Sequence, residues 1–104
     1  MDLVDEVYRA VKVFPRDELF GLTAQTKRAA SSIPSLIAEG RGRSTDRDQR
    51  HFYCQARGSN YELQTEIEIA LRQQFLSATD SMRLVNLSEE VGRLINGLIR
   101  SVDP

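Results

Sequence analysis

Residues Ser31–Thr45 read SSIPSLIAEGRGRST, a helical pattern that contains a proline and ends in a glycine-arginine turn. A proline in a helix interior removes one backbone hydrogen bond and crowds the carbonyl four residues earlier, which costs ~3 kcal/mol or more. Two separate helices, with Pro34 at the first position of the second, would leave Ile33 as a poor N-cap. We therefore predict one helix that is kinked at Pro34, with the hydroxyls of Ser31 or Ser32 covering the freed backbone groups.

The turn at the end of this stretch separates two long helices. Gly42 is a natural left-handed residue at a helix C-terminus. Thr45 is followed by two acids with the spacing of a capping box, so a new helix begins there. We place the second helix from about Leu22 to Arg41 and the third from about Thr45 to Gln74. Gly58 lies inside the third helix, where we expect a close contact with another helix.

Two further amphipathic patterns flank this pair of helices. Apolar residues recur at three- and four-residue steps from Leu3 to Phe14, and Pro15 ends that helix. Leu19 and Phe20, in the connector that follows, are expected to pack into the end of the bundle. A fourth helix begins near Ser77 and carries a wide apolar face. Four helices joined by short connectors predict an all-α, up-down-up-down four-helix bundle.

The composition is that of one small globular domain, which covers residues 1–104. Hydrophobic residues make up 40% and charged residues 28% of the chain, with a net charge of −1, which excludes a disordered chain. No apolar run approaches the ~20 residues that a membrane span needs. The single cysteine rules out an intrachain disulfide, and the acidic N-terminus is unlike a signal peptide. We therefore expect a cytoplasmic protein that does not interact with membranes.

Positive charge is concentrated in the middle of the chain. Residues 27–57 carry seven basic residues against three acids, whereas the segments on either side are net negative. Guanidinium groups suit phosphates, and the helix start near Thr45 adds backbone N–H groups that favour anions. The competing interpretation is a solvated face that pairs with acids of neighbouring helices or subunits. The candidate nucleic-acid-binding residues are Lys27, Arg28, Arg41, Arg43, Arg47 and Arg50.

Short segments along nearly the whole chain resemble one known family. They are Phe20-Gly21-Leu22-Thr23, Lys27-Arg28-Ala29-Ala30, Ser32-Ile33-Pro34-Ser35, Ile37-Ala38-Glu39-Gly40, Gly42-Arg43, Ala56-Arg57-Gly58-Ser59, Tyr61-Glu62-Leu63 and Asn96-Gly97-Leu98-Ile99. In this order and spacing they are similar to the four-helix-bundle family called 23S rRNA-intervening-sequence proteins. Leu36 departs from the pattern, because the family usually has asparagine after Pro-Ser.

The resemblance implies a four-helix bundle that assembles into a ring-like homopentamer. Some members are encoded within inserts in bacterial large-subunit ribosomal RNA genes. Similar proteins, the accessory variability determinants of retroelements, bind nucleic acid and a reverse transcriptase. The resemblance therefore implies a homo-oligomer whose further partners are RNA or DNA, or a reverse transcriptase or another protein. The long second and third helices beside a short first helix also leave surface for another chain to cover.

Two glutamates and one arginine in the matched segments are expected to have a structural role. Glu39 precedes the glycine-arginine turn, and Glu62 follows the glycine in the third helix. We expect Arg28, Arg43 or Arg57 to form ion pairs with them, because burying a carboxylate without a partner is costly. The alternative makes the two glutamates a pair for metal binding or acid–base chemistry.

Signals for catalysis are sparse. His51 and Cys54 lie three residues apart on one helix face, but one histidine and one cysteine cannot complete a zinc site within a monomer. The sequence has no Gly-x-Ser-x-Gly elbow and no Walker-type phosphate loop. We expect a non-enzymatic interaction protein with no metal or cofactor. The alternatives are an enzyme whose site forms at a subunit junction, from Glu39, Glu62, His51 and Cys54, or a scaffold that binds only protein.

Overall fold

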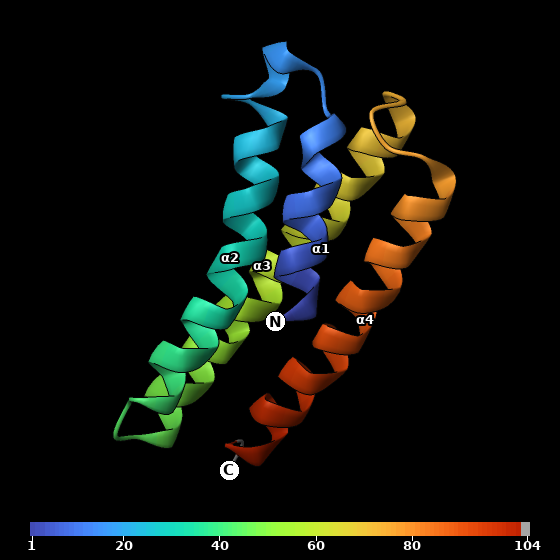
Figure 1. Cartoon of the computed structure of the whole chain (residues 1–104). Coiled ribbons are helices and arrows are strands. Elements are labelled where there is room, and N and C mark those ends of the chain that lie inside the picture. The colour runs from blue at the N-terminus through green and yellow to red at the C-terminus, as the bar shows by residue number, and fades with distance from the viewer. Residues whose placement is uncertain (103–104) are drawn as a thin grey trace.

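The computed structural model describes residues 1–102, which form an all-α protein with no strand in that range (Figure 1). Its helices are α1 (Asp2–Ala10), α2 (Leu22–Arg41), α3 (Asp46–Arg72) and α4 (Ala78–Ser101), with 3-10 turns at Val11–Val13 and Arg16–Glu18. The predicted all-α class with four helices is therefore confirmed. No helix within the described residues has the length and the apolar character needed to cross a membrane.

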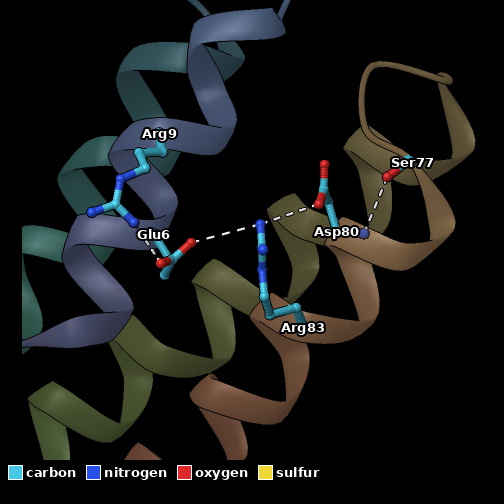
Figure 2. Close-up of polar contacts among 5 residues, drawn as sticks. All are labelled: Glu6, Arg9, Ser77, Asp80 and Arg83. Atoms are coloured by element: carbon cyan, nitrogen blue, oxygen red, sulfur yellow. Dashed lines mark hydrogen bonds and ion pairs between the residues drawn. The ribbon is translucent and has the colours of Figure 1, made fainter.

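The helix ends lie close to the predicted positions because the signals that set them are local. The Thr45 hydroxyl accepts a hydrogen bond from the Asp48 N–H at 3.1 Å, at the start of α3. The Ser77 hydroxyl accepts one from the Asp80 N–H at 3.1 Å, at the start of α4 (Figure 2). A cap of this kind stabilises a helix by about 1 kcal/mol.

Helix α2 is one continuous helix with Pro34 in its interior, as the poor capping ability of Ile33 predicts. The carbonyl that Pro34 leaves without its helical donor is that of Ala30. The hydroxyls expected to cover it bond elsewhere: Ser31 donates to the Arg28 carbonyl and Ser32 to the Ala29 carbonyl. A serine hydroxyl in a helix reaches carbonyls three or four residues back, which places that of Ala30 out of reach for these two.

The helix C-termini differ from the prediction. Gly42 has φ −81°, so it is not left-handed, and its N–H bonds the carbonyls of Ala38 and Glu39. The left-handed residue is Gln74, with φ 63°, just after α3. There the Phe75 N–H returns to the Ala70 carbonyl at 2.9 Å, a bond that satisfies a carbonyl at the helix end.

The four helices share one hydrophobic core. Ile33 of α2, Leu63 of α3 and Ile95 of α4 are completely buried, and burial of each such side chain stabilises the fold by roughly 1.5–3 kcal/mol. Helices α2 and α3 pack side by side up to the turn that joins them (Figure 1). The glycine contact lies elsewhere than expected: a Cβ at Gly58 would meet nothing within 4 Å, whereas one at Gly40 would lie 2.7 Å from Cε1 of Tyr53.

Helix α1 covers only one half of the bundle, where it packs between α2 and α4 (Figure 1). Its apolar side faces the core, and on its polar side Glu6 bridges to α4. The Glu6 carboxylate lies 2.6 Å from Nη1 of Arg9 and 3.6 Å from Nη2 of Arg83, which also reaches Asp80 at 3.1 Å (Figure 2). These pairs are largely exposed, so they orient α1 more than they stabilise it.

The connector between α1 and α2 corrects one expectation. Leu19 is 51% exposed and Phe20 is 92% exposed, so neither packs into the end of the bundle. The connector extends beyond the ends of α1 and α2, so that Leu22 is the first apolar residue after it to be buried (Figure 1). This end of the molecule therefore presents apolar side chains to solvent.

Candidate functional site

The turn between α2 and α3 gathers four of the six candidate arginines and lysines at one end of the molecule (Figure 1). We call Arg41, Arg43, Arg47 and Arg50 the basic turn; all four are exposed. Arg41, Arg43 and Arg47 form no ion pair within the described residues. Their guanidinium groups are therefore available to an anionic partner.

Local contacts hold the basic turn in place. The Arg43 guanidinium carbon lies 4.4 Å from the centre of the Phe52 ring, a cation–π distance. The Gln49 side-chain amide donates a 2.9 Å hydrogen bond to the Arg43 carbonyl. Gly40, at the end of α2, has no side chain to separate that helix from Tyr53 and Phe52. The contacts of Arg43 and of Gly40 thus fix the basic turn to the first turns of α3.

Asp46 and Asp48 reduce the positive charge of the basic turn without neutralising it. Both are exposed, and both lie in the first turn of α3, where carboxylates favour the positive end of the helix dipole. Neither forms an ion pair in the part of the chain that the structure describes. The segment 41–50 keeps four arginines against two acids.

Lys27 and Arg28 do not belong to the basic turn. They lie about 20 Å from Arg41 along α2, at 1.5 Å per residue. The Lys27 ammonium sits 5.2 Å from the centre of the Tyr8 ring on α1, which places it at the other end of the bundle. The six predicted residues therefore form two groups, and only the basic turn is compact.

The predicted ion pairs of Glu39 and Glu62 are absent from residues 1–102. Both glutamates are exposed, so water replaces the arginine partners that burial would have required. Arg57 is half-buried and bonds neutral groups instead: Nη1 donates to Oδ1 of Asn96 at 3.4 Å. It joins α3 to α4 without a carboxylate.

The buried carboxyl group belongs to Glu66, which the sequence reading does not single out. Glu66 is 4% exposed, and neither of its carboxyl oxygens has a hydrogen-bond partner within the described residues. Burial raises the pKa of Glu66 from 4.5 to about 7; the nearby charge of Glu62 adds to the rise, and that of Arg28 opposes it. The available signal was position, since Glu66 follows Leu63 by three residues and precedes Ala70 by four, on the edge of the core face.

A second buried polar group links α3 to α4. Asn60 Nδ2 donates to the Ser88 carbonyl at 2.9 Å, and the Ser88 hydroxyl donates to Asn60 Oδ1 at 2.7 Å. Gln64 Nε2 donates to the same hydroxyl at 2.8 Å. Every member of this network is satisfied by another, so it fixes the register of the two helices and offers no free group for chemistry.

Metal-binding residues do not cluster among residues 1–102. No group of three or more His, Cys, Asp or Glu side chains there is close enough to hold an ion. His51 is exposed and its Nε2 lies 3.1 Å from the side-chain amide nitrogen of Gln55, while Cys54 is half-buried.

A comparison with family models identifies the family of this chain. The comparison with curated proteins returned no match. A family model described as 23S rRNA-intervening sequence protein matches residues 1–97, which is nearly the whole chain. The match covers all of α1, α2 and α3 and most of α4. The chain therefore belongs to the 23S rRNA-intervening sequence protein family.

Proposed function

We propose that this chain is a non-enzymatic, homo-oligomeric helical-bundle protein that binds nucleic acid, alone or within a ribonucleoprotein, through the basic turn. The observation that carries the proposal is the exposure of Arg41, Arg43 and Arg47 around one turn, with no ion pair in the described part of the chain. Guanidinium groups bind phosphate oxygens in a forked geometry, and they do so without reading base sequence. Membership of the 23S rRNA-intervening sequence protein family also supports an association with nucleic acid.

The geometry of the basic turn suits a phosphate backbone. Arg43 lies over Phe52, which limits the freedom that the arginine would lose on binding. The arginines extend from the end of α2 across the turn to the first turns of α3, so several phosphates of one strand are within reach. Asp46 and Asp48 favour a partner that approaches from the side of α2, away from their carboxylates.

Homo-oligomer formation is supported by apolar side chains on the outside of the long helices. Tyr61 and Ile69 of α3 are 57% and 42% exposed, and Met82 and Leu94 of α4 are both 67% exposed. Exposed apolar surface of this kind marks protein interfaces. The short connections between helices support an up-down-up-down path, and the family resemblance supports a ring of five chains.

A scaffold that binds only protein is the second candidate, because the same exposed apolar residues would serve it. It differs from the leading proposal because it does not require the exposed arginines. A protein scaffold needs the faces around Met82 and Leu94, whereas nucleic-acid binding needs the basic turn.

Filter binding with structured RNA and with duplex DNA, at two salt concentrations, tests the leading proposal. We expect log affinity to fall with log salt concentration with a slope of about −2 or steeper, because three arginines would release the counterions of three phosphates. The variant Arg41→Ala/Arg43→Ala/Arg47→Ala should lose most of this binding. Its control, Arg16→Ala/Arg72→Ala/Arg83→Ala, removes the same charge from the connector, the end of α3 and the first turns of α4, at the other end of the molecule (Figure 1). Binding that both variants weaken equally, or no binding that depends on salt, would refute the proposed interface.

Sedimentation equilibrium tests the assembly separately. One chain has a mass of 11.8 kDa, so a pentamer has a mass of about 59 kDa. A single species of 11.8 kDa at micromolar concentration would contradict the oligomer.

A further inference from the structure

A pocket of about 450 Å³ opens where the end of α1, the connector and the first turns of α2 meet. This end lies opposite the basic turn (Figure 1). Its apolar wall is formed by Tyr8, Val11, Phe14 and Leu19. The volume lies within the range of natural small-molecule sites, which are mostly apolar with a few polar groups that fix orientation.

The polar lining of this pocket is positive. It contributes Arg9, Lys12, Arg16 and Lys27 and no carboxylate. Arg9 is paired with Glu6, but the other three form no ion pair within residues 1–102. Lys27 instead rests against the face of a lining aromatic ring, as described above. The pocket thus joins an apolar wall to three uncompensated cations.

The acids nearest in sequence do not neutralise this lining. Asp17 and Glu18 follow Arg16 in the chain, yet neither lines the pocket. Glu18 Oε1 accepts a hydrogen bond from the Leu22 N–H at 3.3 Å, which holds it at the start of α2. Residues 1–26 are net negative in sequence, so the positive lining arises only from how the side chains are placed.

Thr23 supplies an unbonded hydroxyl group to the pocket. The residue lines the pocket and is only 6% exposed, and its hydroxyl makes no hydrogen bond in the described part of the chain. Thr26, one turn later, differs, because its hydroxyl donates a hydrogen bond to the Leu22 carbonyl at 2.6 Å. Among the described residues only the carboxyl oxygens of Glu66 are fully buried without a partner, so the Thr23 hydroxyl is accessible from the pocket and is free to bond a ligand that enters it.

We propose that this pocket binds a small amphipathic organic anion. Its apolar body lies on Phe14 and Leu19, its anionic head is held by Lys12, Arg16 and Lys27, and the Thr23 hydroxyl bonds the ligand. An inorganic phosphate would use the cations and leave the apolar wall empty. A neutral apolar molecule would use the wall and leave the cations unpaired. The proposal does not depend on nucleic-acid binding, because it involves none of the residues of the basic turn.

Fluorescence titration of the full chain with two matched probes tests this proposal. Anilinonaphthalene sulfonate has an aromatic body and one negative charge, and N-phenyl-1-naphthylamine has the same body without the charge. We expect saturable binding of one sulfonate probe per chain, at least tenfold tighter than that of the neutral probe. Inorganic phosphate at the same concentration should not displace the sulfonate. Equal affinity for the two probes, or displacement by phosphate, would overturn the proposal.

Two variants assign the binding to this pocket. Thr23→Val keeps the shape of the side chain and removes the hydroxyl, and Lys12→Gln/Arg16→Gln removes two exposed charges. Each variant should bind the sulfonate probe with an affinity that is lower by about fivefold or more. The control Arg93→Gln/Arg100→Gln changes the net charge equally and should leave the affinity unchanged. Circular dichroism melting shows whether each variant is folded. If both pocket variants bind as the unchanged chain does, the pocket is not the site and the proposal fails.

A vesicle assay separates a free anion from a lipid surface. The exposed Phe20 beside the pocket would also suit an anionic membrane. Cosedimentation with phosphatidylglycerol vesicles that depends on Lys12 and Arg16, in a chain that binds no free sulfonate probe, would replace the proposal by membrane binding. Probe binding without cosedimentation would support it.

Discussion

Glu66 makes the stability of the protein depend on pH through its buried carboxyl group. Its pKa is raised from 4.5 to about 7 in the folded state, so the folded chain holds this proton more tightly than the unfolded chain. Below pH 4.5 the group is protonated in both states and has no effect. As the pH rises from 4.5 to about 7, the folded state loses about 3 kcal/mol of stability through this group, at 1.36 kcal/mol per pH unit.

Glu66→Gln should therefore remove a fall in the free energy of unfolding between pH 5 and pH 8. At pH 8 we expect the variant to be roughly 1–3 kcal/mol more stable than the unchanged chain, since it no longer buries a charge. Urea unfolding followed by circular dichroism at three pH values measures this. Glu89→Gln is the control, because Glu89 is exposed on α4 and forms no ion pair among the described residues. An identical pH dependence in both variants would show that the Glu66 carboxyl is not buried in solution.

Two glycines allow a matched test of close packing at the residue scale. A Cβ at Gly40 would lie 2.7 Å from Cε1 of Tyr53 and 3.1 Å from Cβ of Phe52, and Tyr53 is too deeply buried to move aside cheaply. Gly40→Ala should lower the free energy of unfolding by about 1–3 kcal/mol. Gly58→Ala meets nothing within 4 Å and should raise it by about 0.5–1 kcal/mol, because alanine restricts the unfolded chain and favours the helix. Thermal melting of both variants shows whether each is less or more stable than the unchanged chain. A stabilising change at Gly40 would contradict the close contact with Tyr53.

The contact between α3 and α4 depends on the buried Asn60–Ser88 network. Ser88→Ala leaves Oδ1 of Asn60 without its donor, and a buried acceptor without a partner costs about 1–3 kcal/mol. We expect chemical denaturation to show a loss of that size. Ser35→Ala, which removes an exposed hydroxyl bonded to the Ser31 carbonyl, should change stability by less than about 0.5 kcal/mol. Equal effects of the two changes would mean that the network does not hold the helices together.

The helices themselves could be predicted from sequence because their signals are local. Apolar spacing, the Thr45 and Ser77 caps and the poor capping ability of Ile33 act within a few residues of chain. Features that depend on how two helices meet could not be predicted in this way. Whether Gly40 or Gly58 marks the close approach depends on the rotation of α3 about its own axis.

The same limit applies to the candidate sites. The basic turn is compact because its arginines are neighbours in sequence, so their grouping was predictable. Charge alone groups Lys27 with these arginines as a candidate nucleic-acid-binding residue, whereas the structure places it beside Tyr8 at the other end. Glu66 sits on the boundary between the core face and the polar face of α3, where spacing does not decide which side a residue takes. The pocket near Thr23 is formed by three separate segments and has no signature in any one of them.

At the scale of the whole molecule, the two ends of the bundle present different chemistry. The described chain is elongated, with extents of 44 × 24 × 18 Å. One end carries the basic turn, and the other carries the exposed connector and its positive, apolar-walled pocket (Figure 1). The sides between them carry the exposed apolar residues of α3 and α4. Assembly through the sides would leave both ends accessible.

Leu94 tests this arrangement. Its side chain is 67% exposed on α4, so Leu94→Asp should leave the fold of a single chain intact while it places a charge in any interface formed by that face. We expect the variant to sediment as a single chain of 11.8 kDa under conditions where the unchanged chain forms the proposed oligomer. Glu89→Gln, which also changes the charge by one unit at another exposed position of α4, serves as the control. Loss of assembly in Leu94→Asp, with helical content preserved, would place the interface on α4. An unchanged mass would exclude the face around Leu94. The apolar residues of α3, Tyr61 and Ile69, would then be the surface that joins the chains.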